Sequence, residues 1–247
     1  MAGFFSLFSQ KTTDNRIKQP TICSLILPAA GTSSRMNGEN KLFMELSGVP
    51  VIVRTLMVIE DCDRINEVII AAQSENIIAI GDLCRKYEIK KVRKIISGGE
   101  TRLLSVRAAL CEVSSDSGLI AIHDAARPLV TVSVILEAIE AAEKFGAAAP
   151  SVQLKDTIKE SKNDMVVRTL DRVRLSAVQT PQVFEASLIK CAVSKAVEDG
   201  VDLTDDCAAV ERIGMSVRLT CGSYENIKIT TPEDIHLAEA LFSKRDY

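Results

Sequence analysis

The sequence lacks tryptophan, contains only two histidines, and is poor in aromatic residues, which make up 4% of its 247 positions. Imidazole is the commonest transition-metal ligand in proteins, so this count excludes a metal centre built mainly from histidine. No apolar run approaches the roughly 18 residues of a membrane-spanning helix. The apolar stretch at residues 1–8 is too short for a secretory signal, and no basic residues precede it. We therefore expect a cytoplasmic protein with no membrane partner.

Closely spaced cysteines are also absent, although the sequence contains seven cysteines. Their number is odd, they are widely scattered, and they form no Cys-x-x-Cys pair. A disulfide framework usually shows an even count in a short secreted chain, and a zinc site shows close pairs. We expect free thiols that serve as small apolar residues in a reducing compartment.

An excess of basic charge is missing as well, because 33 acidic residues oppose 30 basic ones and give a formal net charge of −3. A protein that holds nucleic acid through a broad basic surface is therefore excluded. A small cationic pocket is not, since net charge averages over the whole surface. Hydrophobic residues make up 47% of the sequence. This fraction excludes disorder for most of the chain and is enough to form a sizeable core.

From residue 22 onward, short apolar runs alternate with segments of helical periodicity. The runs predict strands at about 22–27, 67–72, 92–96, 119–122 and 147–152, with shorter strands near 217–219 and 227–229. Helices are predicted at about 50–59, 74–87, 100–113, 133–145, 185–198 and 204–212, and from 232 onward. Continuous apolar strands separated by helices predict an α/β fold with a Rossmann-like, mostly parallel sheet flanked by helices. We expect a single domain over 22–247 behind a flexible N-terminal extension over 1–21.

A segment at about 154–172 interrupts this alternation. It is rich in charge and threonine, and a turn signal at Ser161–Asp164 separates two β-prone pieces at 157–159 and 165–169. This pattern predicts a protruding β-hairpin arm. Because an isolated two-stranded hairpin is marginal in water, we expect the arm to pack on a second copy of the chain and to form a homodimer.

The loop after the first predicted strand is a candidate phosphate site. Its small residues Pro28, Ala29, Ala30 and Gly31 let the backbone approach a ligand, and Arg35 and Lys41 would add positive charge there. Open α/β sheets bind ligands beyond the carboxyl ends of their strands, where this loop lies. The loop matches neither Gly-x-Gly-x-x-Gly nor the Walker A spacing, which disfavours a dinucleotide-dependent dehydrogenase and a P-loop enzyme.

Further motifs follow the other predicted strands. They are Gly98-Gly-Glu-Thr-Arg-Leu-Leu-Ser105, His123-Asp-Ala-Ala-Arg-Pro128, Lys155-Asp-Thr157, Asp171-Arg172, Thr180-Pro-Gln-Val-Phe184, Thr204-Asp205 and Asn226-Ile-Lys-Ile-Thr-Thr-Pro-Glu-Asp234. Together with the first loop, they resemble the 2-C-methyl-D-erythritol 4-phosphate cytidylyltransferase family of the nucleotidyltransferase superfamily, over about residues 22–243. Ser33 and Asn40 stand where members often have glycine and proline.

The resemblance implies an enzyme that transfers CMP from CTP to the phosphate of 2-C-methyl-D-erythritol 4-phosphate, with release of pyrophosphate and with Mg²⁺ as the divalent cation. This reaction belongs to the non-mevalonate route to isoprenoid precursors. It brings two anions together and spreads negative charge over the transition state, so it depends on positioned cations rather than on an acid–base pair or a nucleophilic side chain.

The resemblance also implies roles for individual residues. Arg35 and Lys41 would stabilise the transition state, and Arg172 and Lys228 would hold the attacking phosphate. Nucleotide binding would fall to Pro28, Ala29, Ala30, Gly31, Gly98, Gly99, Glu100 and Ser105, and substrate binding to Asp124, Arg127, Thr157 and Thr230. Asp124 would also assist a Mg²⁺ ion that is held mainly by the triphosphate, and Thr157 would reach the site of the neighbouring subunit. His123 is interpreted as structural, since the reaction does not need it.

Two alternatives stay open. Cytidylyltransferases for another polyol phosphate, such as ribitol 5-phosphate, share the architecture, and only a few hydroxyl contacts separate the two substrates. A non-catalytic nucleotide-binding homologue is the other alternative. The presence of all four predicted catalytic cations argues against it, because binding alone does not need cations on both reacting phosphates.

Replacement of either cation of the first loop tests its predicted role. Arg35→Ala and Lys41→Ala should each lower turnover by about 100-fold or more, because each removes a charge that stabilises the transition state. The fold should stay intact in both variants. Pyrophosphate release and circular dichroism measure the two quantities, and wild-type turnover in both variants would place the transition-state cations elsewhere.

Overall fold

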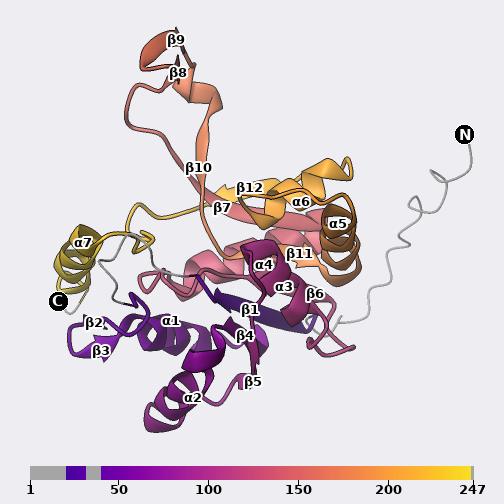
Figure 1. Ribbon diagram of the computed structural model, residues 1–247, viewed down its shortest axis with the longest axis vertical. Coiled ribbons are helices and arrows are strands. Elements are labelled where there is room, and N and C mark those ends of the chain that lie inside the picture. Colours follow the sequence, from indigo (N-terminus) through magenta and orange to yellow (C-terminus); the bar gives the residue numbers. More distant parts are fainter. Residues whose placement is uncertain (1–20, 32–39, 246–247) are drawn as a thin grey trace, which may run out of the picture.

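An eight-stranded sheet forms the centre of the computed structural model, which describes residues 21–31 and 40–245 (Figure 1). Its strands are β1 (Cys23–Ala29), β4 (Ile65–Ala72), β5 (Val92–Ser97), β6 (Leu119–Ile122), β7 (Ala147–Gln153), β10 (Ser176–Val178), β11 (Gln182–Glu185) and β12 (Arg218–Cys221). β1 pairs in parallel with β4 and β6, β4 with β5, and β7 with β12. The predicted α/β fold with a mostly parallel sheet is confirmed.

The direction in which the chain crosses the sheet reverses at β1. From β1 the chain continues outward to β4 and β5, and it then places β6 on the opposite side of β1. The loops that follow β1 and β6 therefore meet at a topological switch point, which is where open α/β sheets bind ligands.

The antiparallel strand β11 is inserted between β6 and β7 and pairs with both. Ser151 of β7 has partners in both β10 and β12, and Ala148 has partners in both β11 and β12. β10 and β11 therefore lie along one edge of β7, and β12 lies along the other. The Thr180–Pro181 peptide bond between β10 and β11 is cis.

Helices cover both faces of the sheet. They are α1 (Val51–Glu60), α2 (Ile77–Lys86), α3 (Arg102–Leu110), α4 (Val132–Phe145), α5 (Ala186–Glu198), α6 (Asp206–Arg212) and α7 (Pro232–Phe242), with short 3₁₀ turns at Ser74–Asn76 and Arg172–Arg174. The buried side chains form two hydrophobic cores. The first core contains side chains of α1, α2, α4 and α7, and the second contains side chains of α3, α5 and α6.

Strand side chains alternate between these two cores. Leu25 and Leu27 of β1 enter the first core, whereas Ile26 enters the second beside its register partners Ile69 and Ile122. All five side chains are fully buried, and each contributes roughly 1.5–3 kcal/mol relative to an exposed position. This packing makes the sheet a rigid base for the loops at its carboxyl edge.

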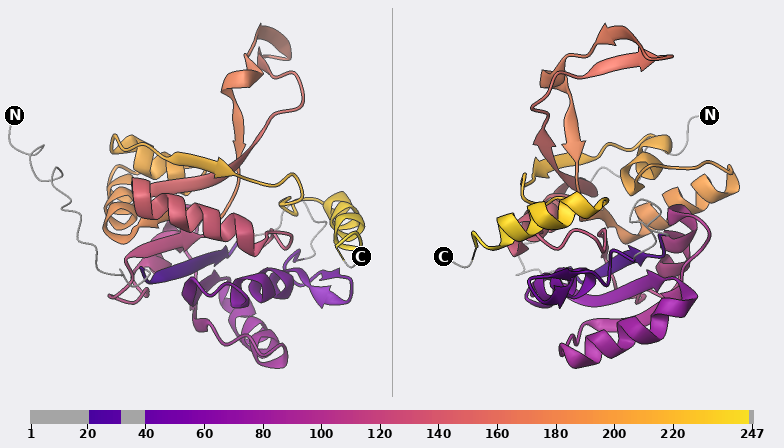
Figure 2. Two further views of the ribbon diagram at one scale, coloured as in Figure 1. Left: turned by 180° about the vertical axis from the view of Figure 1, so that it is seen from behind. Right: turned by 60° about the vertical axis from the view of Figure 1, so that its left-hand side comes forward.

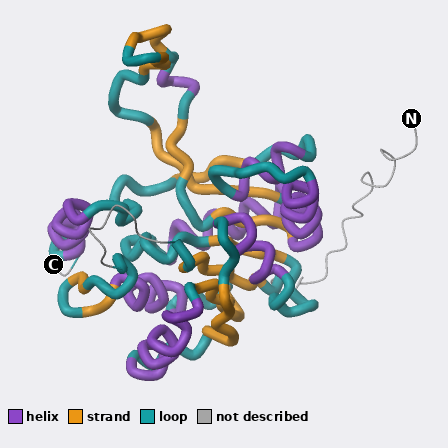
Figure 3. Tube along the Cα trace, in the orientation of Figure 1, coloured by secondary structure: helices purple, strands orange, loops and turns teal. Residues whose placement is uncertain are grey.

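The predicted arm extends away from the sheet in each view (Figures 1 and 2). β8 (Lys159–Lys162) and β9 (Met165–Thr169) form a separate antiparallel hairpin at its tip, linked to the sheet by loops (Figure 3). Asn163 and Asp164 at the turn have φ of 50° and 62°, in the left-handed region that asparagine and aspartate tolerate. The first strand begins at Lys159, two residues later than the sequence pattern predicts.

Several predicted elements differ from the structure. The strand predicted at 227–229 is wrong, because residues 226–230 form a loop; Ile229 N–H donates to Ala126 O at 2.8 Å. The sequence pattern missed β10 and β11, together with the small hairpin of β2 (Glu45–Leu46) and β3 (Val49–Pro50). These strands have two to four residues, too few to show a period.

None of the helices that the structure describes is long and apolar enough to span a membrane.

Candidate active site

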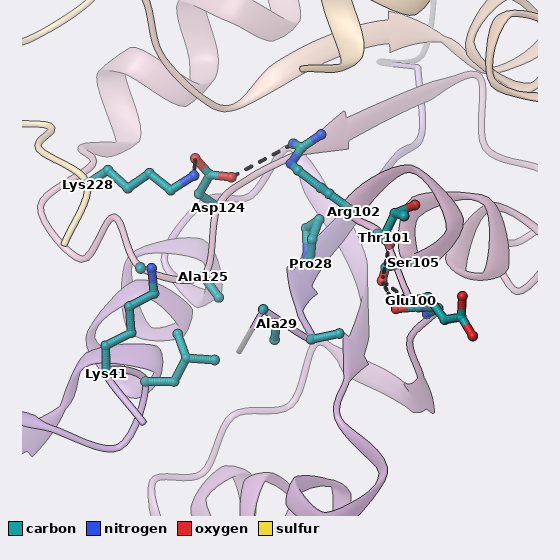
Figure 4. Close-up of a pocket in the computed structure, with 15 residues that line it drawn as sticks. Pro28, Ala29, Lys41, Glu100, Thr101, Arg102, Ser105, Asp124, Ala125 and Lys228 are labelled. Carbon is teal, nitrogen blue, oxygen red and sulfur yellow. Dashed lines mark hydrogen bonds and ion pairs between the residues drawn. The ribbon is translucent and has the colours of Figure 1, made fainter. Parts of the chain in front are cut away.

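A cavity of about 270 Å³ opens at the carboxyl ends of β1 and β6 (Figure 4). Four segments and one distant lysine line it: Pro28, Ala29, Ala30 and Gly31; Lys41 and Leu42; Gly99, Glu100, Thr101, Arg102 and Ser105; Asp124, Ala125 and Ala126; and Lys228. The cavity thus lies at the switch point of the sheet. It gathers most of the residues that the sequence predicts for nucleotide binding.

Asp124 directly follows β6 and is surrounded by positive charge. Its Oδ2 lies 3.0 Å from Lys228 Nζ and 3.2 Å from Arg127 Nε, and its Oδ1 lies 3.8 Å from Arg102 Nη2. Burial alone would raise the pKa of Asp124, but Lys228, Arg102 and Arg127 outweigh it and hold that pKa well below its usual range. Asp124 is therefore an anion at any physiological pH, and three cations share its single charge.

Hydrogen bonds from side chains to backbone carbonyls fix the loop that carries Lys228 to the Asp124 loop and to Thr180. Arg127 Nη1 donates to Asn226 O at 2.7 Å, and the Asn226 side chain donates to Thr180 O at 3.0 Å. On the other side of Lys228, Asp234 Oδ2 accepts from the backbone N–H and the hydroxyl of Thr230, both at 2.8 Å. These contacts place the Lys228 ammonium beside Asp124 although no regular element holds it.

His123 precedes Asp124 and is fully buried in a chain of hydrogen bonds. Its Nε2 lies 3.4 Å from Arg127 O, its Nδ1 lies 2.9 Å from Thr180 Oγ1, and Thr180 Oγ1 accepts from Asp124 N–H at 3.0 Å. Because a carbonyl can only accept, Nε2 carries the proton and Nδ1 accepts from the Thr180 hydroxyl. The neutral ring thereby orients the Asp124 backbone, in accord with the structural role predicted for it.

The loop between β5 and α3 passes so close to the β1 loop that it requires glycine. A Cβ atom on Gly98 would lie 2.5 Å from the Cβ of Ala30, and one on Gly99 would lie 2.5 Å from the Cβ of Leu104. A side chain at Gly98 would push the two loops apart, and one at Gly99 would push its loop away from Leu104 of α3. The nucleotide-binding wall predicted from the sequence is therefore a tightly packed backbone surface.

Ser105 stabilises the loop between β5 and α3 through hydrogen bonds to its backbone. Its hydroxyl accepts from Gly99 N–H at 3.1 Å and donates to Thr101 O at 2.9 Å. Ser105 lines the cavity but is 2% exposed. Its hydroxyl is thus engaged in shaping the loop.

The Lys41 side of the cavity depends on a turn that begins at Asn40. The Asn40 side chain accepts from Leu42 N–H at 3.1 Å, and its carbonyl accepts from Phe43 N–H at 2.9 Å. Asn40 thus forms the turn that presents Lys41. Arg35 and Ser33 lie outside the described residues.

Other predicted residues lie away from the cavity. Arg172 and Thr157 are exposed on the arm, where Arg172 Nη1 donates to Lys155 O at 2.6 Å. Thr230 is bonded to Asp234 and does not line the cavity. The single described chain therefore brings Lys41, Asp124 and Lys228 together but leaves both arm residues outside.

Arg102 was missed as a site residue. It lies in the first turn of α3 inside a motif that was otherwise assigned to nucleotide binding, and its guanidinium reaches Asp124 from the side opposite Lys228 (Figure 4). The sequence indicates only that a basic residue stands shortly after the Gly98-Gly99 turn. The residues around Arg102 in the sequence do not indicate which carboxylate it pairs with.

The described residues do not form a protein-held metal site. Within 21–31 and 40–245, no group of three His, Cys, Asp or Glu side chains is placed to hold a metal ion. Asp124, predicted to assist Mg²⁺, already faces three cations within 3.8 Å, and these would repel a divalent ion. A Mg²⁺ ion at this cavity would depend on phosphate oxygens for its ligands.

A mostly parallel α/β sheet with a cationic cavity at its switch point can bind and align phosphates. The fold and the site together define an α/β nucleotidyltransferase. The family model of 2-C-methyl-D-erythritol 4-phosphate cytidylyltransferase (IspD) matches residues 23–244. The chain belongs to this family, whose reaction is the transfer of a cytidylyl group from CTP to 2-C-methyl-D-erythritol 4-phosphate in isoprenoid precursor biosynthesis.

Individual relatives agree with this assignment. The 2-C-methyl-D-erythritol 4-phosphate cytidylyltransferase of Halalkalibacterium halodurans is 44% identical over 224 residues, which are 90% of this chain and 98% of the relative. That of Caldanaerobacter subterraneus subsp. tengcongensis is 43% identical and covers 90% and 99%.

Solved structures show the same fold. The 4-diphosphocytidyl-2C-methyl-D-erythritol synthase of Anaerococcus prevotii superposes with a TM-score of 0.81 at 31% identity, over 91% of this chain and 100% of that chain. The cytidylyltransferase of Thermus thermophilus gives a TM-score of 0.72 at 30% identity, over 89% and 98%.

The buried His123 predicts a pH dependence of stability. Burial lowers its pKa to about 4, whereas an unfolded chain has a histidine pKa near 6.5. The unfolded state therefore binds more protons below about pH 6.5, so the free energy of unfolding should fall by about 3 kcal/mol between about pH 6.5 and pH 4. Urea unfolding at a series of pH values measures this slope.

In a His123→Asn variant, the part of this pH dependence of the unfolding free energy that His123 contributes should disappear. The matched control is His236→Asn at an exposed histidine, whose side chain is 84% accessible. We expect it to keep the slope of the wild type. Equal slopes in the wild type and His123→Asn would show that His123 is not held neutral by the fold.

Proposed function

We propose that the cavity holds the two reacting phosphates of the family's reaction, one from CTP and one from the polyol phosphate. The observation that carries this proposal is the convergence of Lys41 and Lys228 on a cavity whose single buried carboxylate, Asp124, is also paired with Arg102 and Arg127. The cations at and beside the cavity outnumber the carboxylates, so the cavity favours a ligand with anionic groups. The cations are Lys41, Arg102, Arg127 and Lys228, and the carboxylates are Glu100, Asp124 and Asp206. CTP and a phosphorylated polyol together supply such groups.

The reaction proceeds by substitution at the α-phosphorus of CTP. An oxygen of the polyol phosphate forms a new bond to this phosphorus, and the bond to the bridging oxygen of the β-phosphate breaks. The electron pair of that bond leaves with pyrophosphate. Lys41 and Arg35 are proposed to stabilise the charge that accumulates on the α-phosphate oxygens, so that catalysis consists of alignment and electrostatic stabilisation.

The polyol phosphate is proposed to bind beside Asp124, with Lys228 and Arg127 supplying charge for its phosphate. Both cations contact Asp124 Oδ2, whereas the partner of Oδ1 is Arg102 at 3.8 Å, beyond hydrogen-bond distance. Oδ1 can therefore accept a hydrogen bond from a substrate hydroxyl. Such a contact would distinguish one polyol from another.

The cytosine base is proposed to bind against the loop formed by Gly98, Gly99 and Glu100, which Ser105 stabilises. The close approach of this loop to Ala30 supports a narrow pocket of backbone groups. Mg²⁺ is proposed to enter with the triphosphate and to be held by its oxygens, where it would neutralise charge on the leaving pyrophosphate.

The arm is proposed to complete the site of a second subunit in a homodimer. Arg172 and Thr157 are exposed on the arm, at positions where they do not reach the cavity of their own chain. The tip of the arm exposes Met165, Val166 and Val167 with accessibilities of 57–72%. Apolar side chains on a projecting arm support packing against another copy of the chain.

A substrate comparison tests the proposed chemistry. With CTP and Mg²⁺, pyrophosphate release from 2-C-methyl-D-erythritol 4-phosphate should exceed that from ribitol 5-phosphate by at least about tenfold in kcat/KM, because lost hydroxyl contacts weaken transition-state binding. A preference for ribitol 5-phosphate would reassign the polyol. Absence of release with both substrates would support the non-catalytic alternative.

Subunit mixing tests the shared site. Lys41→Ala damages the cavity, and Arg172→Ala damages only the arm, so each homodimer should be nearly inactive. After subunit exchange, half of the dimers are mixed and contain one intact site in two, so activity should return to about a quarter of the wild-type value. Pyrophosphate release from the equilibrated mixture measures this recovery.

The matched control mixes Lys41→Ala with Lys228→Ala. Both substitutions damage the cavity itself, so no mixed dimer has an intact site and activity should stay low. A monomer in solution scattering at assay concentration, or equal activities in the two mixtures, would contradict a site shared through the arm.

A further inference from the structure

A second buried carboxylate, Asp206, contacts the same Arg102 nitrogen that faces Asp124. Arg102 Nη2 donates to Asp206 Oδ2 at 2.6 Å, and the Asp206 side chain is 1% exposed. Burial raises the pKa of Asp206, and Arg102 acts against this rise. One guanidinium nitrogen thus pairs with two buried carboxylates, and Asp206, the closer of the two, does not line the cavity.

The position of Asp206 is set by β11. Gln182 Oε1 accepts from the backbone N–H groups of Asp206 and Cys207, both at 3.0 Å, and Gln182 Nε2 donates to Asp205 Oδ2 at 2.9 Å. Gln182 is 2% exposed, so these bonds are shielded from water. They attach the first turn of α6 to the strand inserted beside β6.

The connection that leads into β11 also supports Asp124. Thr180 lies two residues before Gln182, in this connection, and accepts from the Asp124 backbone N–H. The connection therefore positions Asp124 directly through Thr180, and the first residue of β11 positions Arg102 indirectly through Gln182 and Asp206. The Thr180-Pro-Gln and Thr204-Asp205 motifs, which no step of the reaction uses, acquire a role in this arrangement.

Charge explains why Arg102 matters to Asp124. Lys228 and Arg127 both attract Oδ2, and without a cation on the other side the carboxylate could turn to give both oxygens to them. Arg102, held by Asp206, keeps Oδ1 on the cavity side. That oxygen is the one left for a substrate hydroxyl.

We propose that Arg102, anchored by Asp206, is a positioning residue that sets the orientation of Asp124 for the polyol phosphate. The inference rests on the proposed contact between Asp124 and the polyol. It assigns Arg102 to recognition of the polyol, although its motif otherwise forms the nucleotide-binding loop.

The test separates binding from folding with four variants. Arg102→Met should raise the KM for 2-C-methyl-D-erythritol 4-phosphate by about tenfold while the KM for CTP and kcat change by less than about twofold. It should also lower the Tm by about 10 °C, because the buried Asp206 carboxylate loses its partner. Arg102→Lys, which keeps the charge, should recover part of both losses. Arg107→Met, at an exposed arginine on the same helix, should leave all values near those of the wild type.

The double variant Arg102→Met/Asp206→Asn is decisive. Removal of the unpaired carboxylate should restore most of the Tm, whereas the KM for the polyol phosphate should stay raised. If both values recover together, Arg102 serves stability alone and the proposal is overturned. A rise in the KM for CTP instead would make Arg102 a triphosphate ligand, which also overturns it.

Asp124→Asn distinguishes this inference from the proposed function on which it rests. A raised KM for the polyol phosphate in Asp124→Asn, together with a normal value in Arg102→Met, would overturn only the positioning role. Normal values in both variants would remove the proposed contact between Asp124 and the polyol, and the positioning role with it.

Discussion

The buried Asp124 carboxylate is the interaction around which the cavity is built. An ionised carboxylate away from water is stable only when it is paired, and Asp124 is paired with Lys228, Arg127 and Arg102. The three cations would repel one another without it. One buried anion therefore allows a slightly acidic protein to keep an excess of positive charge at one place, ready for phosphates.

This arrangement draws together segments that lie far apart in the sequence. Asp124 follows β6, Arg102 begins α3, and Lys228 lies in a loop without regular structure. The antiparallel strand β11 and the connection before it support them, because Thr180 in the connection bonds to the Asp124 backbone and Gln182 in the strand fixes the turn that carries Asp206. An antiparallel strand in an otherwise parallel part of the sheet thus has a clear physical role, as it brings two polar side chains beneath the site.

The sequence predicts the larger elements and part of the site for the same reason: both depend on local patterns. Apolar runs and helical stripes predict β1 and α4 well, and the resemblance of the surrounding motifs to those of the family predicts Asp124 and Lys228. β11 was missed because its few residues carry no period. The pairing of Arg102 with Asp206 spans 104 residues and is created only by the packing of α6 on β11, so no local pattern predicts it.

The two halves of the proposed site are formed by different groups, backbone on the nucleotide side and charged side chains on the polyol side. The nucleotide side is packed backbone, where Gly98 and Gly99 leave no space for a Cβ atom. The polyol side consists of charged side chains around Asp124, and the proposed dimer would add Thr157 and Arg172. A backbone wall cannot change its shape without a change in the packing of α3, whereas a side chain can be replaced singly. In the proposed site, the preference for cytosine would therefore be tied to the fold, while the preference for one polyol over another would depend on a few contacts around a single carboxylate.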